Sequence, residues 1–176
     1  MATCAVALCL LAVSGCSGSD SGAELKYGES ANVTTEKAGS YDVAVLRVEQ
    51  GKNSDLDVFK DTSRYAGKTP YYVHYRITKT EDRQKVPAPY FGAYAGDKQL
   101  TALNVMPSFD FSDPLAPVVQ EFDKCTGFDS ADFKKAAKGQ SFKGCDIYLA
   151  ESGTGAPTDI RLLPDKIGDD PLVIWK

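Results

Sequence analysis

The sequence predicts an all-β protein, an antiparallel β-sandwich with one short helix. Residues 70–78 alternate between two sets of side chains, which is the period of a half-buried strand. Several other short apolar runs are separated by turn residues, and only one segment has the pattern of a helix. Nine Tyr and eight Phe beside two Met give a composition typical of a β-rich domain.

The first strand is expected over residues 23–27 and 32–35, with an interruption near Gly28. Residues 41–49 form the first strong strand, and their alternation breaks at residues 45–46. Such a break predicts either a β-bulge or a strand that is buried on both faces.

Residues 51–68 are rich in turn-forming side chains and are expected to form a long loop with a short edge strand over residues 56–59. Residues 70–78 are the clearest strand and are expected at the centre of a sheet. One face carries Tyr71, Val73, Tyr75 and Ile77. The other face carries Tyr72, His74, Arg76 and Thr78. We expect the first set to face the core.

Two apolar runs, residues 87–94 and 99–105, flank a Gly-Asp turn at residues 96–97 and predict a β-hairpin. Three prolines punctuate residues 107–117, where strand pairing would lose backbone donors. This stretch is therefore expected to be irregular.

The helix is expected over residues 129–139 and is two turns long at most. Asp129 or Ser130 suits its N-cap, and Gly139 suits the left-handed closing position. The remaining strands are expected over residues 141–150, 158–163 and 172–175.

The N-terminal residues have the pattern of an export signal. Residues 13–16, Val-Ser-Gly-Cys, resemble a bacterial lipobox, and this resemblance implies a diacylglycerol on the Cys16 thiol and cleavage immediately before it. The uncharged run over residues 2–13 is too short for a bilayer-spanning helix, which needs about 20 residues. The predicted organisation is a lipoprotein signal peptide, a flexible tether and one domain, over residues 1–15, 16–22 and 23–176.

No Lys or Arg precedes Lys26, although an export signal ordinarily begins with a cationic segment. We therefore expect the true translation start to lie upstream of Met1. A plain secretory peptide that is cut nearby is the alternative to the lipobox. Both interpretations place the domain outside the cytoplasm, and the lipobox adds a membrane anchor on Cys16.

Cys125 and Cys145 are the pair that remains after processing and acylation. In an exported chain this pair predicts a disulfide, and closing a loop of about 20 residues stabilises a fold by about 3 kcal/mol. No metal site is expected, because the chain has one His and no second Cys near either partner. The net charge of −4 argues against nucleic-acid binding.

The order of these features resembles an immunoglobulin-like, telokin-like domain of bacterial surface lipoproteins. That family has no known function and is related in fold to secreted immunoprotective antigens. The resemblance rests on residues 41–49, 71–78, 96–97, 138–144 (Lys-Gly-Gln-Ser-Phe-Lys-Gly) and 146–149. It covers about residues 23–176 and implies an immunoglobulin-like sandwich. The proline-rich stretch and the Cys pair depart from the family pattern, and the family supplies no functional residue to carry over.

The sequence offers few patterns for catalysis. His74 is the only histidine and no Gly-x-Ser-x-Gly elbow accompanies it. Residues 53–57 imitate the start of a calcium loop, but the sixth and twelfth positions lack the required Gly and Glu. An acidic stretch could supply the paired carboxylates of a glycoside hydrolase, although we favour a solvated loop for this stretch. That stretch contains Asp110, Asp113, Glu121 and Asp123.

We therefore predict a non-catalytic binding or interaction module at the cell envelope, anchored to the membrane through Cys16. It requires no cofactor, and its ligand is a protein or a cell-wall component. The candidate binding face consists of Tyr72, His74 and Arg76, while most other aromatic residues fill the core. Two alternatives stay open, an envelope hydrolase with a site in the loops or the carboxylate-rich stretch, and a surface antigen or spacer without a dedicated ligand.

Overall fold

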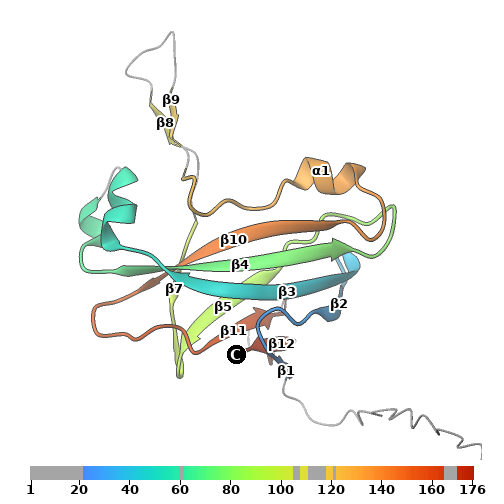
Figure 1. Cartoon of the computed structure of the whole chain (residues 1–176), viewed down its shortest axis with the longest axis horizontal. Helices are drawn as coiled ribbons and strands as arrows, with labels where there is room; N and C mark the ends of the chain where they lie inside the picture. Colours follow the sequence, from blue (N-terminus) through green and yellow to red (C-terminus); the bar gives the residue numbers. More distant parts are fainter. Residues whose placement is uncertain (1–21, 60–61, 105–107, 111–117, 121, 165–169) are drawn as a thin grey trace, which may run out of the picture.

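Two five-stranded β-sheets pack face to face in this protein (Figure 1). The structure is a computed structural model and describes residues 22–59, 62–104, 108–110, 118–120, 122–164 and 170–176. The predicted all-β sandwich is confirmed. Cys16 and the predicted signal peptide lie outside the described residues.

The sheets bring together strands from both ends of the chain. One sheet has the order β1 (Ala23–Leu25), β12 (Val173–Trp175), β11 (Asp159–Leu163), β5 (Tyr90–Ala95) and β6 (Lys98–Gln99). The other has the order β2 (Ala31–Thr35), β3 (Gly39–Gln50), β4 (Thr69–Lys79), β10 (Ser141–Ala150) and β7 (Thr101–Leu103). Neighbouring strands are antiparallel except β1 and β12, which run parallel. The expectation of a wholly antiparallel sandwich is therefore corrected at this pair.

Strand β4 lies at the centre of its sheet, as predicted, with β3 on one side and β10 on the other. The register between β3 and β4 shifts between Val45 and Arg47, which places one extra residue, Leu46, on β3. An extra residue of this kind is a β-bulge. The break in alternation at residues 45–46 is thus explained by a bulge.

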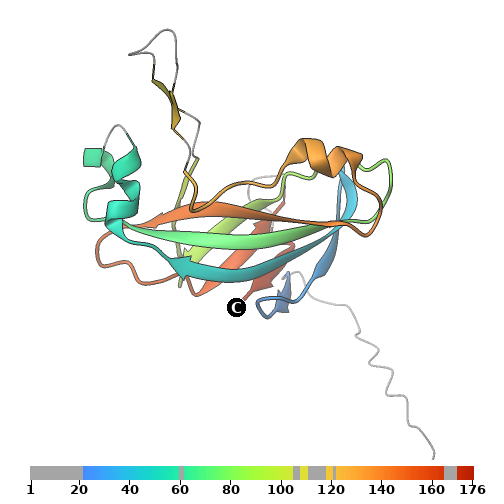
Figure 2. The same ribbon diagram turned by 45° about the horizontal axis from the view of Figure 1, so that its top comes forward.

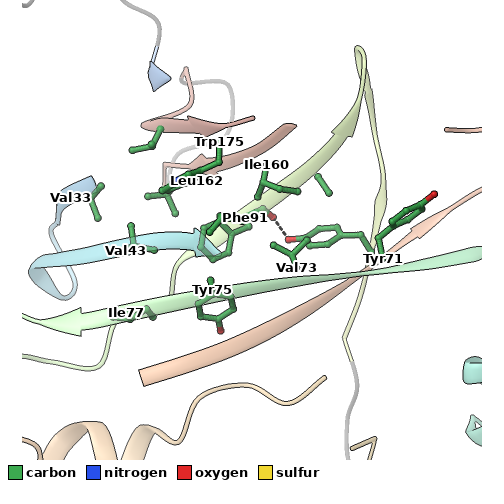
Figure 3. Close-up of a cluster of buried hydrophobic side chains, with 14 of the residues drawn as sticks. Val33, Val43, Tyr71, Val73, Tyr75, Ile77, Phe91, Ile160, Leu162 and Trp175 are labelled. Atoms are coloured by element: carbon green, nitrogen blue, oxygen red, sulfur yellow. Dashed lines mark hydrogen bonds between the residues drawn. The ribbon is translucent and has the colours of Figure 1, made fainter. Parts of the chain in front are cut away.

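The main core lies between the two sheets. Strand β4 contributes the predicted inner set, Tyr71, Val73, Tyr75 and Ile77, and each of these is at most 5% exposed. The opposite sheet contributes Phe91, Ile160, Leu162 and Trp175 (Figure 3). The indole N–H of Trp175 donates to the Glu29 carbonyl at 2.9 Å, so its polar atom has a partner inside the apolar cluster.

A short 3₁₀ helix, η1 (Asn53–Val58), takes the place of the edge strand predicted over residues 56–59. A second one, η2 (Thr62–Tyr65), follows in the same loop. The Asp55 carboxylate accepts the backbone N–H of Lys52 at 2.9 Å, and the Asp55 N–H donates to the Lys52 carbonyl. Such local polar bonds stabilise a helical turn against an extended strand. Leu56, the apolar residue of that stretch, is buried at 1% exposure.

The predicted hairpin forms only in part. Strands β5 and β6 meet at a turn in which Gly96 has a φ of 62°, a conformation that suits glycine. At Leu100 the chain then leaves this sheet and continues as β7 beside β10 in the other sheet. Leu100 is 4% exposed and packs into the main core. The second strand of the predicted hairpin is therefore divided between the two sheets, because Leu100 turns inward between them.

Helix α1 (Ser130–Lys135) is shorter than the predicted segment. Its N-cap is Asp129, as predicted, and the Asp129 carboxylate accepts from the backbone N–H groups of Ala131 and Asp132 at 2.7 and 3.1 Å. Gly139 has a φ of 88° but follows the helix by several residues and donates its N–H to Lys79 on β4. The predicted glycine closure is therefore wrong, because another group completes this end.

That group is the ammonium of Lys79, which is 1% exposed. The Lys79 Nζ donates to the carbonyl oxygens of Phe133, Lys134 and Ala136 at 3.1, 3.3 and 2.7 Å. The last carbonyls of a helix have no partner within the helix, and a cation there also complements the helix dipole. Strand β4 thus supplies the C-terminal cap of α1.

Strands β8 (Ser108–Asp110) and β9 (Val118–Gln120) pair with each other and stand apart from both sheets (Figures 1 and 2). The prolines of residues 107–117 lie outside the described residues. Across the described ranges, no helix has the length and hydropathy needed to cross a membrane.

Candidate functional site

A cleft opens at the edge of the sandwich where β10 extends beyond its outer neighbour, β7. Strand β10 pairs with β4 along its whole length but with β7 only at residues 147–149. The cleft has a volume of about 350 Å³ and lies among β5, β7, β10 and the segment of Cys125. Its lining includes Tyr90, Phe91, Asn104, Cys125, Asp146 and Tyr148.

Asp146 is the only carboxylate among the described residues that line this cleft. It lies directly opposite Val73 of β4, and directly paired residues share one face of a sheet, so Asp146 is on the inner face. Asp146 is half-buried, and burial is the one cause that shifts its pKa, with no contribution from a hydrogen bond or an ion pair in the described part of the chain. Burial raises the pKa of Asp146 from 3.8 to about 6, because the charged form is poorly solvated there.

Tyrosines surround this carboxylate. The Tyr148 hydroxyl donates to the Phe91 carbonyl at 2.6 Å, which ties β10 to β5 across the cleft. Burial and then the Asp146 charge raise the pKa values of Tyr75 and Tyr148 well above their usual range, so both keep their protons. Tyr90 is 58% exposed and lies at the surface of the same lining. The cleft therefore places one acidic group in a lining that includes the aromatic residues Tyr90, Phe91 and Tyr148.

Asp146→Asn is expected to stabilise the protein at pH 7.5 by up to about 3 kcal/mol, because a raised carboxylate pKa means that ionisation opposes folding. The folded state binds this proton more tightly than the unfolded chain. The contribution of Asp146 to stability is thus complete below pH 3.8 and is lost as the pH rises through about 6. Urea unfolding of both proteins at pH 7.5 and pH 4 measures the difference, which should nearly vanish at pH 4. An equal effect at both pH values would contradict this origin.

A disulfide closes one side of the cleft. It joins Cys125 to Cys145, the pair predicted from the sequence, with a Cα–Cα distance of 5.1 Å. Cys145 immediately precedes Asp146 on β10, and both cysteines belong to the lining. The adjacent Lys124 forms an ion pair with Asp55 of η1, and this contact lowers the pKa of the Asp55 carboxyl. The covering segment is therefore attached to the sheet by a covalent bond and by an ion pair.

The predicted binding face is corrected at Tyr72. This side chain is 3% exposed, and its hydroxyl donates to Asp55 Oδ2 at 2.9 Å. It belongs to a second hydrophobic cluster on the outer face of the sheet, which we call the outer cluster. The outer cluster consists of Leu56, Tyr72, Phe122, Cys125, Cys145, Ile147 and Leu149. Because η1 and the segment of Phe122 cover this half of the face, Tyr72 is not available to a ligand.

His74 and Arg76 lie on the same face but do not form a site with Tyr72. His74 Nε2 is 3.5 Å from Glu49 Oε2, and burial followed by the nearby Arg47 charge lowers the pKa of His74. Arg76 donates to the Ser30 hydroxyl at 3.2 Å. Among the described residues, His74 Nε2 is a buried atom without a hydrogen-bond partner, and the structure does not bring His74 and Arg76 together around a common cavity.

The other sequence candidates converge on no catalytic centre. Asp113 and Glu121 lie outside the described residues, so the acidic stretch is only partly placed. The calcium-like residues 53–57 form η1, where Asp55 is engaged by Lys52, Tyr72 and Lys124. The described ranges contain no group of three or more His, Cys, Asp or Glu arranged to hold a metal ion.

Sequence reasoning missed Asp146, although a signal was present. Strand β10 alternates, and its inner set is Phe142, Gly144, Asp146, Tyr148 and Ala150. A charged residue in the middle of a core-facing set is unusual and indicates a local opening or a functional group. Gly144 belongs to the same arrangement, because a Cβ at this position would lie 2.4 Å from the Tyr75 ring.

Neither a known protein family nor a curated protein matches this chain. Among solved structures, its fold resembles the crystal structure of a secreted protein from Mycobacterium tuberculosis, MPT63. The two share 14% sequence identity with a TM-score of 0.52, over 90% of this chain and 99% of MPT63. At this identity the likeness concerns the fold, and the two proteins share the β-sandwich architecture.

Proposed function

We propose that this protein is an exported, lipid-anchored, non-catalytic binding module whose ligand site is the cleft beside Asp146. The observation that carries the proposal is a carboxylate without a partner among the described residues, in a cleft of about 350 Å³ whose lining includes aromatic and aliphatic side chains. Small-molecule sites are commonly concave, mostly apolar and equipped with a few polar groups that orient the ligand.

The chemistry of the lining favours binding over hydrolysis. Most glycoside hydrolases use two carboxylates that flank the bond to be cut, and the described lining supplies one. A nucleophile with an adjacent base is the other common arrangement, yet His74 lies on the outer face near Glu49. Asp146 is therefore suited to hold a ligand by charge.

Three features support an extracytoplasmic location. Disulfides persist mainly outside the cytoplasm, and this chain has one between Cys125 and Cys145. The fold resembles that of a secreted protein. The lipobox-like residues 13–16 add the finer proposal of a lipid anchor on Cys16.

The anchor is tested by Cys16→Ala in the full chain. Wild-type protein is expected to incorporate radiolabelled palmitate and to partition into the detergent phase of a Triton X-114 extract. The variant should lose both properties, because it has no thiol to acylate and no processing site. The matched control is Cys9→Ala within the same uncharged run, which should behave as wild type. Equal labelling of the Cys16→Ala protein would exclude Cys16 as the anchor.

The ligand site is tested without assuming a ligand. A library of small fragments of mixed charge is titrated into the ¹⁵N-labelled domain, residues 23–176, and the backbone amides that shift are mapped. We expect the shifts to cluster on residues 90–91, 103–104 and 145–148, which line the cleft. Shifts that cluster on another surface, or a library without any binder, would refute the cleft as the site.

A further inference from the structure

We propose that the cleft selects small organic cations, namely primary ammonium compounds with an aromatic or aliphatic body, whose nitrogen pairs with Asp146. This inference rests on the proposed function and names the ligand class of the same site. Three properties of the cleft support this ligand class: the charge of Asp146, the side chains of the lining, and the small number of oxygen atoms available to a metal ion.

The charge of Asp146 has no compensation within the cleft. The described lining contains no Lys, Arg or His, and its other polar side chains are Tyr90, Asn104 and Tyr148. On β4, Asp146 pairs with Val73, and the titratable group of this strand that interacts with its charge is the Tyr75 hydroxyl, which keeps its proton. An isolated carboxylate in a poorly solvated place is costly unless a cation accompanies it. A ligand with a positive charge supplies the missing partner.

The walls favour an organic cation. Tyr90 presents an exposed aromatic ring and Leu103 a half-buried aliphatic side chain. Behind them the lining continues with side chains that are at most 3% exposed, namely Phe91, Tyr148 and Ile147. Such walls bury a carbon skeleton favourably, and aromatic rings also attract ammonium groups. A ligand with an apolar body and one ammonium group matches both parts of the lining.

A metal ion does not match the same lining. Calcium takes six to eight oxygen ligands and magnesium requires near-octahedral oxygen coordination. The described lining offers one carboxylate, and no group of three acidic or other metal-binding side chains exists in the described ranges. A neutral polyol is also a poor match, because it would leave the Asp146 charge uncompensated.

The test compares benzylamine with benzyl alcohol, which has nearly the same shape and no charge. Both are titrated into the domain at pH 7.5 and followed by the amide shifts of residues 145–148. Benzylamine is expected to bind at least tenfold more tightly than benzyl alcohol. Asp146→Asn should remove this preference, whereas Asp97→Asn, which removes one charge at an exposed turn, should leave it unchanged.

The pH dependence gives a second readout on the unmodified protein. Benzylamine keeps its proton between pH 4.5 and 7.5, so only the protein titrates in this range. Its affinity should fall about tenfold for each pH unit below about 6, because Asp146 becomes protonated. The affinity of benzyl alcohol should stay constant.

The outcomes separate the inference from the proposed function. Equal binding of both probes in the cleft, or an amine preference that survives Asp146→Asn, overturns the cation selectivity and leaves the cleft as a binding site. Benzylamine binding on another surface, or a pH-independent affinity, also overturns the inference. If neither probe nor any library fragment shifts the cleft amides, the proposed function itself is overturned.

Discussion

Tyr72→Ala is expected to lower the free energy of unfolding by about 3 to 5 kcal/mol, the range for removing a large aromatic side chain from a packed site. The Tyr72 ring lies 6.0 Å from the Phe122 ring in the outer cluster, and its hydroxyl donates to Asp55. Truncation would remove this packing and leave a largely buried carboxylate with one partner fewer. The sequence pattern alone predicts a change within about 1 kcal/mol, because it places Tyr72 on the outer face.

Guanidinium unfolding of a matched set of variants measures this effect. Arg76→Ala, on the same face of β4 but outside the outer cluster, should cost less than about 1 kcal/mol. Val73→Ala on the inner face should cost about 1 to 4 kcal/mol, because Val73 is fully buried. If Tyr72→Ala were as mild as Arg76→Ala, the outer cluster would contribute little to stability and the face would be open in solution.

Lys79→Ala is expected to cost about 3 to 5 kcal/mol, which is large for the loss of a lysine. The ammonium caps three carbonyl oxygens at the end of α1 and lies 5.4 Å from the centre of the Phe133 ring. Its removal would take one donor from each of these carbonyl oxygens, of which that of Phe133 keeps the Ala136 N–H, and would open a space where the long side chain lies.

Thermal and urea unfolding, together with proteolysis near α1, measure the result. Lys134→Ala is the matched control, because Lys134 is an exposed lysine of the same helix. Lys79→Met restores part of the packing but none of the hydrogen bonds, so its stability should fall between Lys79→Ala and wild type. A Lys79→Met protein as stable as wild type would show that the side chain acts through packing alone.

The strand pattern was predictable where one local rule decides the outcome. The alternation of β4 identifies the inner set, the irregular step at residues 45–46 offers the bulge as one of two interpretations, and the N-cap of α1 is Asp129, one of the two residues expected there. Each of these depends on residues that are close together in the chain. Short-range side-chain patterns are sufficient for features of this kind.

The sequence pattern could not predict in the same way that other segments cover part of the outer face of β4. A two-residue period tells which side chains share a face, but it does not tell whether another segment lies over that face. Tyr72 is buried by Leu56 and Phe122, which come from segments on either side of β4 in the sequence. The cleft depends likewise on β7 ending at Leu103 while β10 continues. Asp146 in the inner set of β10 indicates an opening, but the sequence of β10 does not tell which neighbouring strand ends there.

The cap on α1 also has a consequence for the order of folding. An isolated helix of six residues is far too short to persist in water, since even favourable sequences need about 12 to 15 residues. The donor that completes α1 is Lys79, which precedes Phe133 by 54 residues. We therefore expect α1 to be completed only after strand β4 is in place. Changes within α1 should accelerate unfolding more than they slow folding. Substitutions in α1 are therefore expected to change the lifetime of the native state more than the time needed to reach it.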